Sequence, residues 1–329
     1  MTFAPTLAVV SSDTIIINYN DGAAAQTSNR DVTGTGISPA LLTLSESDPY
    51  DYGLIADGGN VTYTFTITNS GASSATGLTE VGLAAPFDFL GGGYPGTGGD
   101  CAGTLNAGAT CNIEIQYGPG VVSAADNDTI DMQYNDGNVV QNATRDVTGV
   151  AVAPASITIT EADPYDYGTL AVGSNLTHVF TLNNAGGFQA SAIAEIGLAA
   201  PFAFSGGTFP GTAGTCGVTL APAASCDIEV EYSPVATGVQ TDTISIQYNN
   251  GATVVTSDRD VQGTGAAPAV ITITETDPYD FGSVTQGAST NHIFTLNNTG
   301  AVPATLVAGA GLAVPFSFTG GSYPGTAGT

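Results

Sequence analysis

The sequence predicts an all-β protein built of antiparallel β-sandwiches in a linear array, and three observations predict it. The 329 residues include 44 glycines but only three lysines and arginines together, so turn-forming residues dominate over helix-favouring ones. Apolar and polar residues alternate in short runs, as they do in half-buried strands. The same runs return about every 115 residues, which is typical of a repeat array.

An acidic motif defines the repeat. Its copies are Glu46–Gly53, Glu161–Gly168 and Glu275–Gly282, which lie 115 and 114 residues apart. These offsets predict four segments. They are the C-terminal part of a repeat in residues 1–38, complete repeats in 39–153 and 154–267, and the N-terminal half of a repeat in 268–329. The partial repeats at both ends favour an excerpt of a longer array over a fibre whose subunits exchange strands.

Strands and turns follow one another in the same order in each repeat. Ile228–Tyr232 and Ile244–Tyr248 alternate apolar and polar residues and predict half-buried strands. Asp136-Gly137 and its counterparts predict two-residue hairpin turns, because these residues tolerate positive φ. About seven strands per repeat suit an antiparallel sandwich. The short linkers that end in proline predict a semi-rigid array.

Several motifs in a fixed order resemble the choice-of-anchor D repeats of bacterial surface proteins. They are Phe202-x-Phe204, Gly206-Gly207-x-Phe209-Pro210-Gly211-Thr212, the Cys216 and Cys226 pair, the Ile228–Pro234 strand, Tyr248–Gly251 and Gly263-Thr264-Gly265. Those repeats are similar to the wider group of ASH/MSP-type immunoglobulin-like (Ig-like) sandwiches. The resemblance implies tandem Ig-like domains in an exported, often very large protein that is extracellular or held at the cell surface.

The four cysteines form two pairs with the same spacing, Cys101 with Cys111 and Cys216 with Cys226. This spacing favours one local disulfide in each complete repeat, and with it an oxidising compartment. Free or metal-bound thiols are the alternative. Zinc sites usually have cysteines closer together and a second ligand pair nearby, and the sequence has neither.

Each acidic motif brings three carboxylates into six residues, a pattern that suits calcium, since hard cations prefer oxygen ligands. Calcium is therefore the one possible cofactor, and the alternative is a solvated acidic loop whose proline and glycine set a turn. The candidate ligands are Glu46, Asp48, Asp51, Glu161, Asp163, Asp166, Glu275, Asp277 and Asp280.

The three arginines, Arg30, Arg145 and Arg259, occupy the same repeat position, and each is followed by Asp and Val. One arginine per repeat among so many acids predicts a structural ion pair or carbonyl-binding role near the last strand. A ligand-binding role is the alternative, although the negative field would repel carboxylate ligands.

Charge and composition exclude several functions. The formal net charge of −26 and the absence of lysine argue against nucleic-acid binding, which needs clustered cations. The apolar stretches fall short of the roughly 18 residues that membrane insertion needs. His178 and His292 are equivalent to Tyr63 and have no nucleophilic partner, so a catalytic triad cannot be assembled. The sequence therefore indicates a protein that is not an enzyme.

These observations predict a structural segment of an extracellular filament, stalk or giant adhesin made of tandem Ig-like repeats. The expected partners are further copies of the same repeat, through self-association in a filament. A carbohydrate- or cell-binding adhesin module, stiffened by calcium, is the alternative. It would require residues at the loop tips that vary between repeats, whereas the repeats are nearly identical.

Overall fold

The computed structural model describes residues 1–328, so Thr329, the last residue of the segment predicted at 268–329, lies outside it. Residues 1–328 contain β-strands and a single 3₁₀ turn, Ser205–Gly207. The tandem Ig-like β-sandwich class expected from the sequence is confirmed. The exact boundaries of the four segments stay a prediction.

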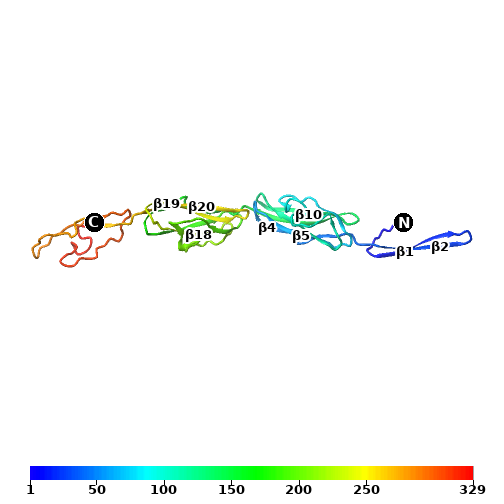
Figure 1. Cartoon of the computed structure of the whole chain (residues 1–329), viewed down its shortest axis with the longest axis horizontal. Helices are drawn as coiled ribbons and strands as arrows, with labels where there is room; N and C mark the ends of the chain where they lie inside the picture. The colour runs from blue at the N-terminus through cyan, green and yellow to red at the C-terminus, as the bar shows by residue number, and fades with distance from the viewer. Residues whose placement is uncertain (329) are drawn as a thin grey trace. The chain divides into compact units, whose positions relative to one another are not determined.

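The first complete repeat has two sheets that enclose one core (Figure 1). One sheet has the order β3-β5-β9-β7 and the other the order β4-β11-β10-β6-β8. The strands are β3 (Leu42–Leu44), β4 (Tyr50–Ala56), β5 (Val61–Asn69), β6 (Ala75–Glu80), β7 (Phe87–Phe89), β8 (Thr104–Leu105), β9 (Thr110–Tyr117), β10 (Ser123–Asn135) and β11 (Val140–Val152). Their number exceeds the expected seven because β3, β7 and β8 are too short to show alternation in the sequence.

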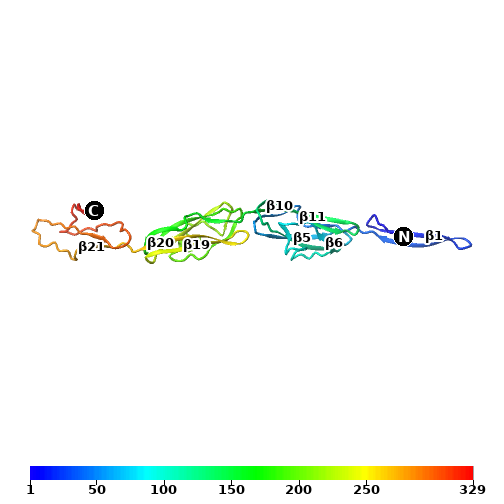
Figure 2. The same ribbon diagram turned by 90° about the horizontal axis from the view of Figure 1, so that it is seen from above.

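The second complete repeat has the same two sheets (Figure 2). Their strand orders are β12-β14-β18-β16 and β13-β20-β19-β15-β17. The strands are β12 (Ile157–Ile159), β13 (Tyr165–Ala171), β14 (Leu176–Asn184), β15 (Ala190–Glu195), β16 (Phe202–Phe204), β17 (Thr219–Leu220), β18 (Ser225–Tyr232), β19 (Gly238–Asn249) and β20 (Val254–Ala266). The repeated motifs therefore occupy equivalent places in the two sandwiches.

The long hairpin of each repeat corrects one expectation. In the β10–β11 hairpin the ladder ends with Asn135 opposite Val140, and the backbone N–H of Asp136 donates to the carbonyl of Val139 at 3.0 Å, so the two residues of the turn are Gly137 and Asn138 rather than Asp136 and Gly137. Asp136 stabilises the loop, since its Oδ1 accepts hydrogen bonds from the backbone N–H groups of Asn138 and Val139 at 2.7 and 2.8 Å. Gly137 adopts a φ of 97°, in the left-handed region that favours glycine. The Asx-Gly motif thus marks a two-residue turn correctly, shifted by one residue along the chain.

One strand pair in each sandwich is parallel, although the other pairs are antiparallel. β4 pairs with β11 from Tyr50 opposite Val147 to Ala56 opposite Val152. The register shifts near Gly53, whose φ of 79° lets the backbone bulge. β13 pairs with β20 in the same way. The two strands of this pair lie near the beginning and at the end of the repeat, so their contact closes the sandwich.

The core of the first complete repeat is rich in aromatic residues. Phe87 and Tyr117 are fully buried, and their rings stack with centroids 4.9 Å apart. Tyr117 also lies against Gly149, where an added Cβ would come within 2.5 Å of the ring. A glycine is required there because the ring leaves no room for a side chain. The equivalent ring in the second repeat, Tyr232, is fully buried as well.

The two partial repeats leave many apolar side chains exposed. Residues 1–38 contain the hairpin of β1 (Val10–Asn20) and β2 (Ala25–Thr35), and residues 268–328 contain the short pair β21 (Ile271–Ile273) and β22 (Leu296–Asn298). Ile17 and Phe316 are 56% and 54% exposed, whereas their counterparts in the complete repeats are buried. Within residues 1–328, no helix has the length and apolarity needed to cross a membrane.

Candidate functional site

Polar side chains that link the two sheets are the repeated feature of the structure, and Arg145 forms one of these links. Arg145 lies on β11, and its Nη2 donates a hydrogen bond of 2.9 Å to the backbone carbonyl of Leu44 on the opposite sheet. Its Nη1 lies 3.7 Å from Oδ2 of Asp48. Oδ1 of Asp48 in turn accepts a bond of 3.0 Å from the backbone N–H of Asp146. We call this set of contacts the arginine clasp.

The second complete repeat contains the same arginine clasp. Arg259 on β20 donates to the carbonyl of Ile159, and its Nη1 lies 3.4 Å from Oδ2 of Asp163. The backbone N–H of Asp260 donates to Oδ1 of Asp163 at 3.2 Å. Arg30 differs, because no ion pair involves it within residues 1–328. The acidic motif that supplies Asp48 has no counterpart in residues 1–38.

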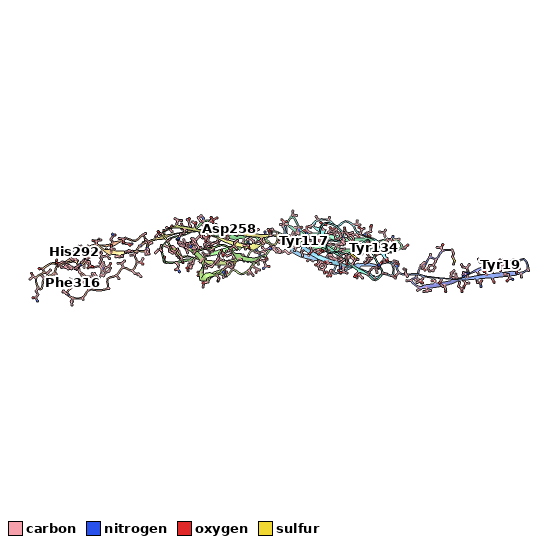
Figure 3. The ribbon with its side chains drawn as sticks, viewed as in Figure 1. Tyr19, Tyr117, Tyr134, Asp258, His292 and Phe316 are labelled. Atoms are coloured by element: carbon pink, nitrogen blue, oxygen red, sulfur yellow. A yellow bond between two sulfur atoms is a disulfide. The ribbon has the colours of Figure 1, made fainter. Side chains whose placement is uncertain are left out.

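Two buried tyrosines add further links in each complete repeat. In the first, the hydroxyl of Tyr52 donates to the carbonyl of Ile115 at 3.1 Å, and the hydroxyl oxygen of Tyr134 accepts from the backbone N–H of Leu42 at 3.2 Å. Each bond joins one sheet to the other. Figure 3 labels Tyr134 among the side chains of the first complete repeat. The equivalent bonds in the second repeat are Tyr167 to Val230 at 2.9 Å and Ile157 to Tyr248 at 3.0 Å.

A buried asparagine is a structural residue that the sequence analysis missed. Asn69 at the end of β5 is fully buried, and its Oδ1 accepts from the backbone N–H groups of Leu41 and Gly71. Its Nδ2 donates to the carbonyls of Ser73 and Leu105 at 2.9 and 3.0 Å. One side chain thus satisfies four backbone groups around the sheet edge. An Asn-x-Gly triplet, repeated at residues 69–71, 184–186 and 298–300, was the signal for it.

The carboxylates of the acidic motif make separate contacts in the structure. Asp48 belongs to the arginine clasp, whereas Oδ1 of Asp51 accepts the backbone N–H of Gly53 at 2.8 Å. Asp166 and Asp280 bind the N–H of the corresponding glycines in the same way. Among residues 1–328, no group of three His, Cys, Asp or Glu side chains is placed to hold a metal ion. Calcium binding itself stays a prediction.

The glutamate of each acidic motif faces an aromatic or imidazole ring instead. A hydrogen bond with Glu46 raises the pKa of Tyr63 to about 12. In the second repeat, His178 takes the place of Tyr63 and stacks on Tyr165 with ring centroids 4.0 Å apart. Nε2 of His178 and Oε2 of Glu161 are both buried and have no hydrogen-bond partner in residues 1–328.

His292, the imidazole that faces the last acidic motif, makes more contacts than His178 does. His292 has its Nδ1 2.8 Å from the hydroxyl of Tyr279 and its Nε2 3.9 Å from Oε1 of Glu275. His178 and His292 therefore both stack on a tyrosine ring of the acidic motif, and His292, which is exposed, also lies near a carboxylate.

Both cysteine pairs are disulfides. Cys101 is bonded to Cys111 with Cα atoms 4.9 Å apart, and Cys216 to Cys226 with Cα atoms 4.8 Å apart. Each bond fastens the segment before a short edge strand, β8 or β17, to a central strand of the other sheet, β9 or β18. The disulfides therefore act in the same way as the arginine clasp, as links between sheets.

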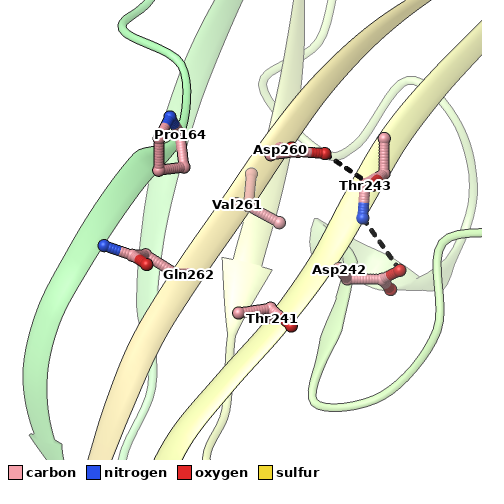
Figure 4. A pocket seen from close by; sticks show the side chains of 7 residues that line it. All are labelled: Pro164, Thr241, Asp242, Thr243, Asp260, Val261 and Gln262. Atoms are coloured by element: carbon pink, nitrogen blue, oxygen red, sulfur yellow. Dashed lines mark hydrogen bonds between the residues drawn. The ribbon is translucent and has the colours of Figure 1, made fainter.

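A groove of about 410 Å³ on the second repeat is lined by both polar and apolar residues, and its two carboxylates make hydrogen bonds within the repeat (Figure 4). Oδ1 of Asp260 accepts the hydroxyl of Thr243 at 2.7 Å. Oδ1 of Asp242 accepts the backbone N–H of Thr243, and its Oδ2 accepts that of Ala199. The two carboxylates thus accept hydrogen bonds from nearby backbone N–H groups and from a threonine hydroxyl. They do not converge on a common point in the groove.

The comparisons with known proteins agree with this fold. Residues 159–263 match the family model described as a HYDIN/CFA65/VesB-like, Ig-like domain, which supports an Ig-like β-sandwich. No curated protein sequence matches the chain significantly. The features described above define a class, a module of tandem Ig-like β-sandwiches whose repeated polar residues hold the sheets together.

Solved structures resemble parts of the chain. The Vibrio cholerae VesB protease is 16% identical, with 34% of this chain and 32% of that chain covered and a TM-score of 0.27. The ASH/PapD-like domain of human CEP192 is 13% identical, with 35% and 87% covered and a TM-score of 0.25. Extracellular cadherin domains 1–4 of protocadherin gamma B7 are 9% identical, with 88% and 67% covered and a TM-score of 0.35. The chain thus spans 32% of the VesB protease.

Proposed function

We propose that this chain is a structural segment of an extracellular filament, stalk or giant adhesin made of tandem Ig-like repeats. The observation that carries the proposal is that both complete repeats devote the same polar residues to links between sheets. Arg145 and Arg259 form equivalent clasps, and each repeat has its own disulfide. Residues kept at equivalent places for internal contacts support a mechanical role and not a catalytic one.

The extracellular location is part of this proposal. Disulfides persist in oxidising surroundings, and the two disulfides support an exported protein. The motif resemblance to choice-of-anchor D repeats of bacterial surface proteins supports the same location. The partners in the proposal are further copies of the repeat.

Protease accessibility on intact producing cells tests the location. Trypsin is unsuitable, because the chain has only three lysines and arginines together, so proteinase K is the reagent of choice. The chain should be degraded while an intracellular marker protein stays intact. Protection of the chain until the cells are lysed would contradict the proposal. Saturable binding of one repeat to a glycan array would instead favour a carbohydrate-binding adhesin module.

A further inference from the structure

We propose that the parallel strand pair and the arginine clasp of each complete repeat together form a clamp that bears tension along the chain. The inference rests on the proposed structural function and names the element that would carry the load. In the first repeat the chain enters through β3 and β4 and leaves through β11. A pull along the chain therefore acts first on β3, which pairs with β5 over only three residues, and then on the N-terminal end of β4; at the other end it acts on the C-terminal end of β11.

The direction of the two strands decides how this pull is resisted. β4 and β11 are parallel and paired from Tyr50 opposite Val147 to Ala56 opposite Val152. The N–H of Asp57 extends the ladder by donating to the carbonyl of Val152 at 2.8 Å. Pulling opposite ends of parallel strands slides them along each other, so the hydrogen bonds share the load and must break together. An antiparallel hairpin pulled at its open end loses its bonds one at a time.

The arginine clasp lies on the path of this load. Residues 45–49 join β3 to β4, and Arg145 on β11 holds both ends of this segment through the Leu44 carbonyl and the Asp48 carboxylate. The Arg145 side chain is only 13% exposed, which limits competition from water at its bond to the Leu44 carbonyl, whereas its ion-pair partner Asp48 is 54% exposed. Tension that reaches the segment before β4 is thus passed directly to the last strand. The clasp therefore reinforces the end of the parallel ladder where the pull enters.

The second repeat contains the same clamp with one more contact. β13 pairs with β20 from Tyr165 opposite Val261 to Ala171 opposite Ala266. In addition, Nε2 of Gln262 donates to Oδ2 of Asp166 at 3.1 Å, a bond across the two strands. Equivalent clamps in both repeats would let them resist similar forces, as expected of units connected in series.

Magnetic tweezers at constant force test the clamp on the full chain tethered at its two ends. The variant R145Q/R259Q removes both clasps, and R30Q is the matched control because Arg30 has the same repeat position and no ion pair. We expect the rate of unfolding under force to rise about tenfold in R145Q/R259Q, since forced unfolding is governed by the unfolding rate. R30Q should leave the rate unchanged. The variant R145K/R259K, which keeps the charge but loses the planar fork, should have an intermediate rate and serves if the Gln variant does not fold.

A core variant separates mechanical from general destabilisation. Ile113 and Ile228 are fully buried on β9 and β18, away from the parallel ladder. I113V/I228V should lower the equilibrium stability, which urea unfolding measures for both variants. At an equal loss of equilibrium stability, I113V/I228V should raise the unfolding rate under force less than R145Q/R259Q does. Equal rates in the matched variants, or a rate within twofold of wild type for R145Q/R259Q, would overturn the clamp. That result would leave the location measured with proteinase K untouched, so the two proposals fail separately.

Discussion

Of the polar residues in the first complete repeat, Asn69 is the one whose substitution we expect to lower the free energy of unfolding most. Its amide satisfies four backbone groups and is fully buried. N69A would remove four hydrogen bonds, of which the bond to Leu105 is buried and the other three are part-buried and open to replacement by water. We therefore expect a total cost of about 3 kcal/mol in the free energy of unfolding, close to the upper cost of about 1–3 kcal/mol for one stranded buried group. Urea unfolding followed by circular dichroism measures the loss.

The control for this prediction is N142A. Asn142 is exposed and makes one side-chain hydrogen bond, to Asp131. Its removal should change the stability by less than about 0.5 kcal/mol. If N69A were as stable as N142A, the buried amide would not be the stabilising contact that the geometry indicates.

The pH dependence of the second repeat should reflect His178. Burial lowers the pKa of His178, and the charge of Glu161 opposes this shift only in part. Below about pH 6.5 the unfolded chain therefore binds more protons than the folded repeat, so stability falls as the pH decreases from about 6.5 and levels off below the folded pKa. H178Y, which introduces the residue type found at the equivalent position 63, should remove this component.

Urea midpoints at pH 7.5 and pH 5 check the prediction. The loss of stability between these values should be smaller in H178Y than in the wild type. Because the other acids are the same in both proteins, the difference isolates the histidine. Identical pH dependence in the two proteins would contradict the role given to burial.

At the scale of elements, each disulfide should stabilise its own repeat. The bond from Cys101 to Cys111 closes a loop with a sequence separation of 10 residues. C101S/C111S should lose about 3 kcal/mol of stability on the chain-entropy model. Two calorimetric transitions are expected, of which only that of the first repeat shifts. A shift of both transitions would show that the two repeats do not unfold independently.

The strands themselves could be predicted from the sequence to a large extent, but their partners could not. Alternation in Ile228–Tyr232 and the Asx-Gly turns located the long strands and hairpins correctly. The parallel pairing of β4 with β11 joins residues about 97 positions apart, and local patterns carry no information about such distant contacts. The same limit hid the partners of Arg145, because Leu44 lies 101 residues away. The Asn-x-Gly triplet repeats with Asn69, but the backbone groups that its side chain satisfies depend on burial and on Leu105, 36 residues away, which the triplet alone does not reveal.

At the scale of the whole molecule, charge governs association. The net charge of −26 makes copies of the chain repel each other. Repulsion extends about 30 Å at 0.01 M salt but about 3 Å at 1 M salt. Sedimentation velocity should therefore find less self-association at low ionic strength, and more after added salt or divalent ions. Association that weakens with added salt would contradict this view and would indicate contacts between opposite charges.

Hydrogen exchange of the intact chain, followed by mass spectrometry, tests the central claim most directly. The claim is that both complete repeats are held by the same set of links between their sheets. Amides of the central strands β9 and β18 should then exchange slowly and to a similar extent, whereas those of the exposed β1–β2 hairpin should exchange fast. Strong protection in one complete repeat together with fast exchange in the central strand of the other would contradict the account.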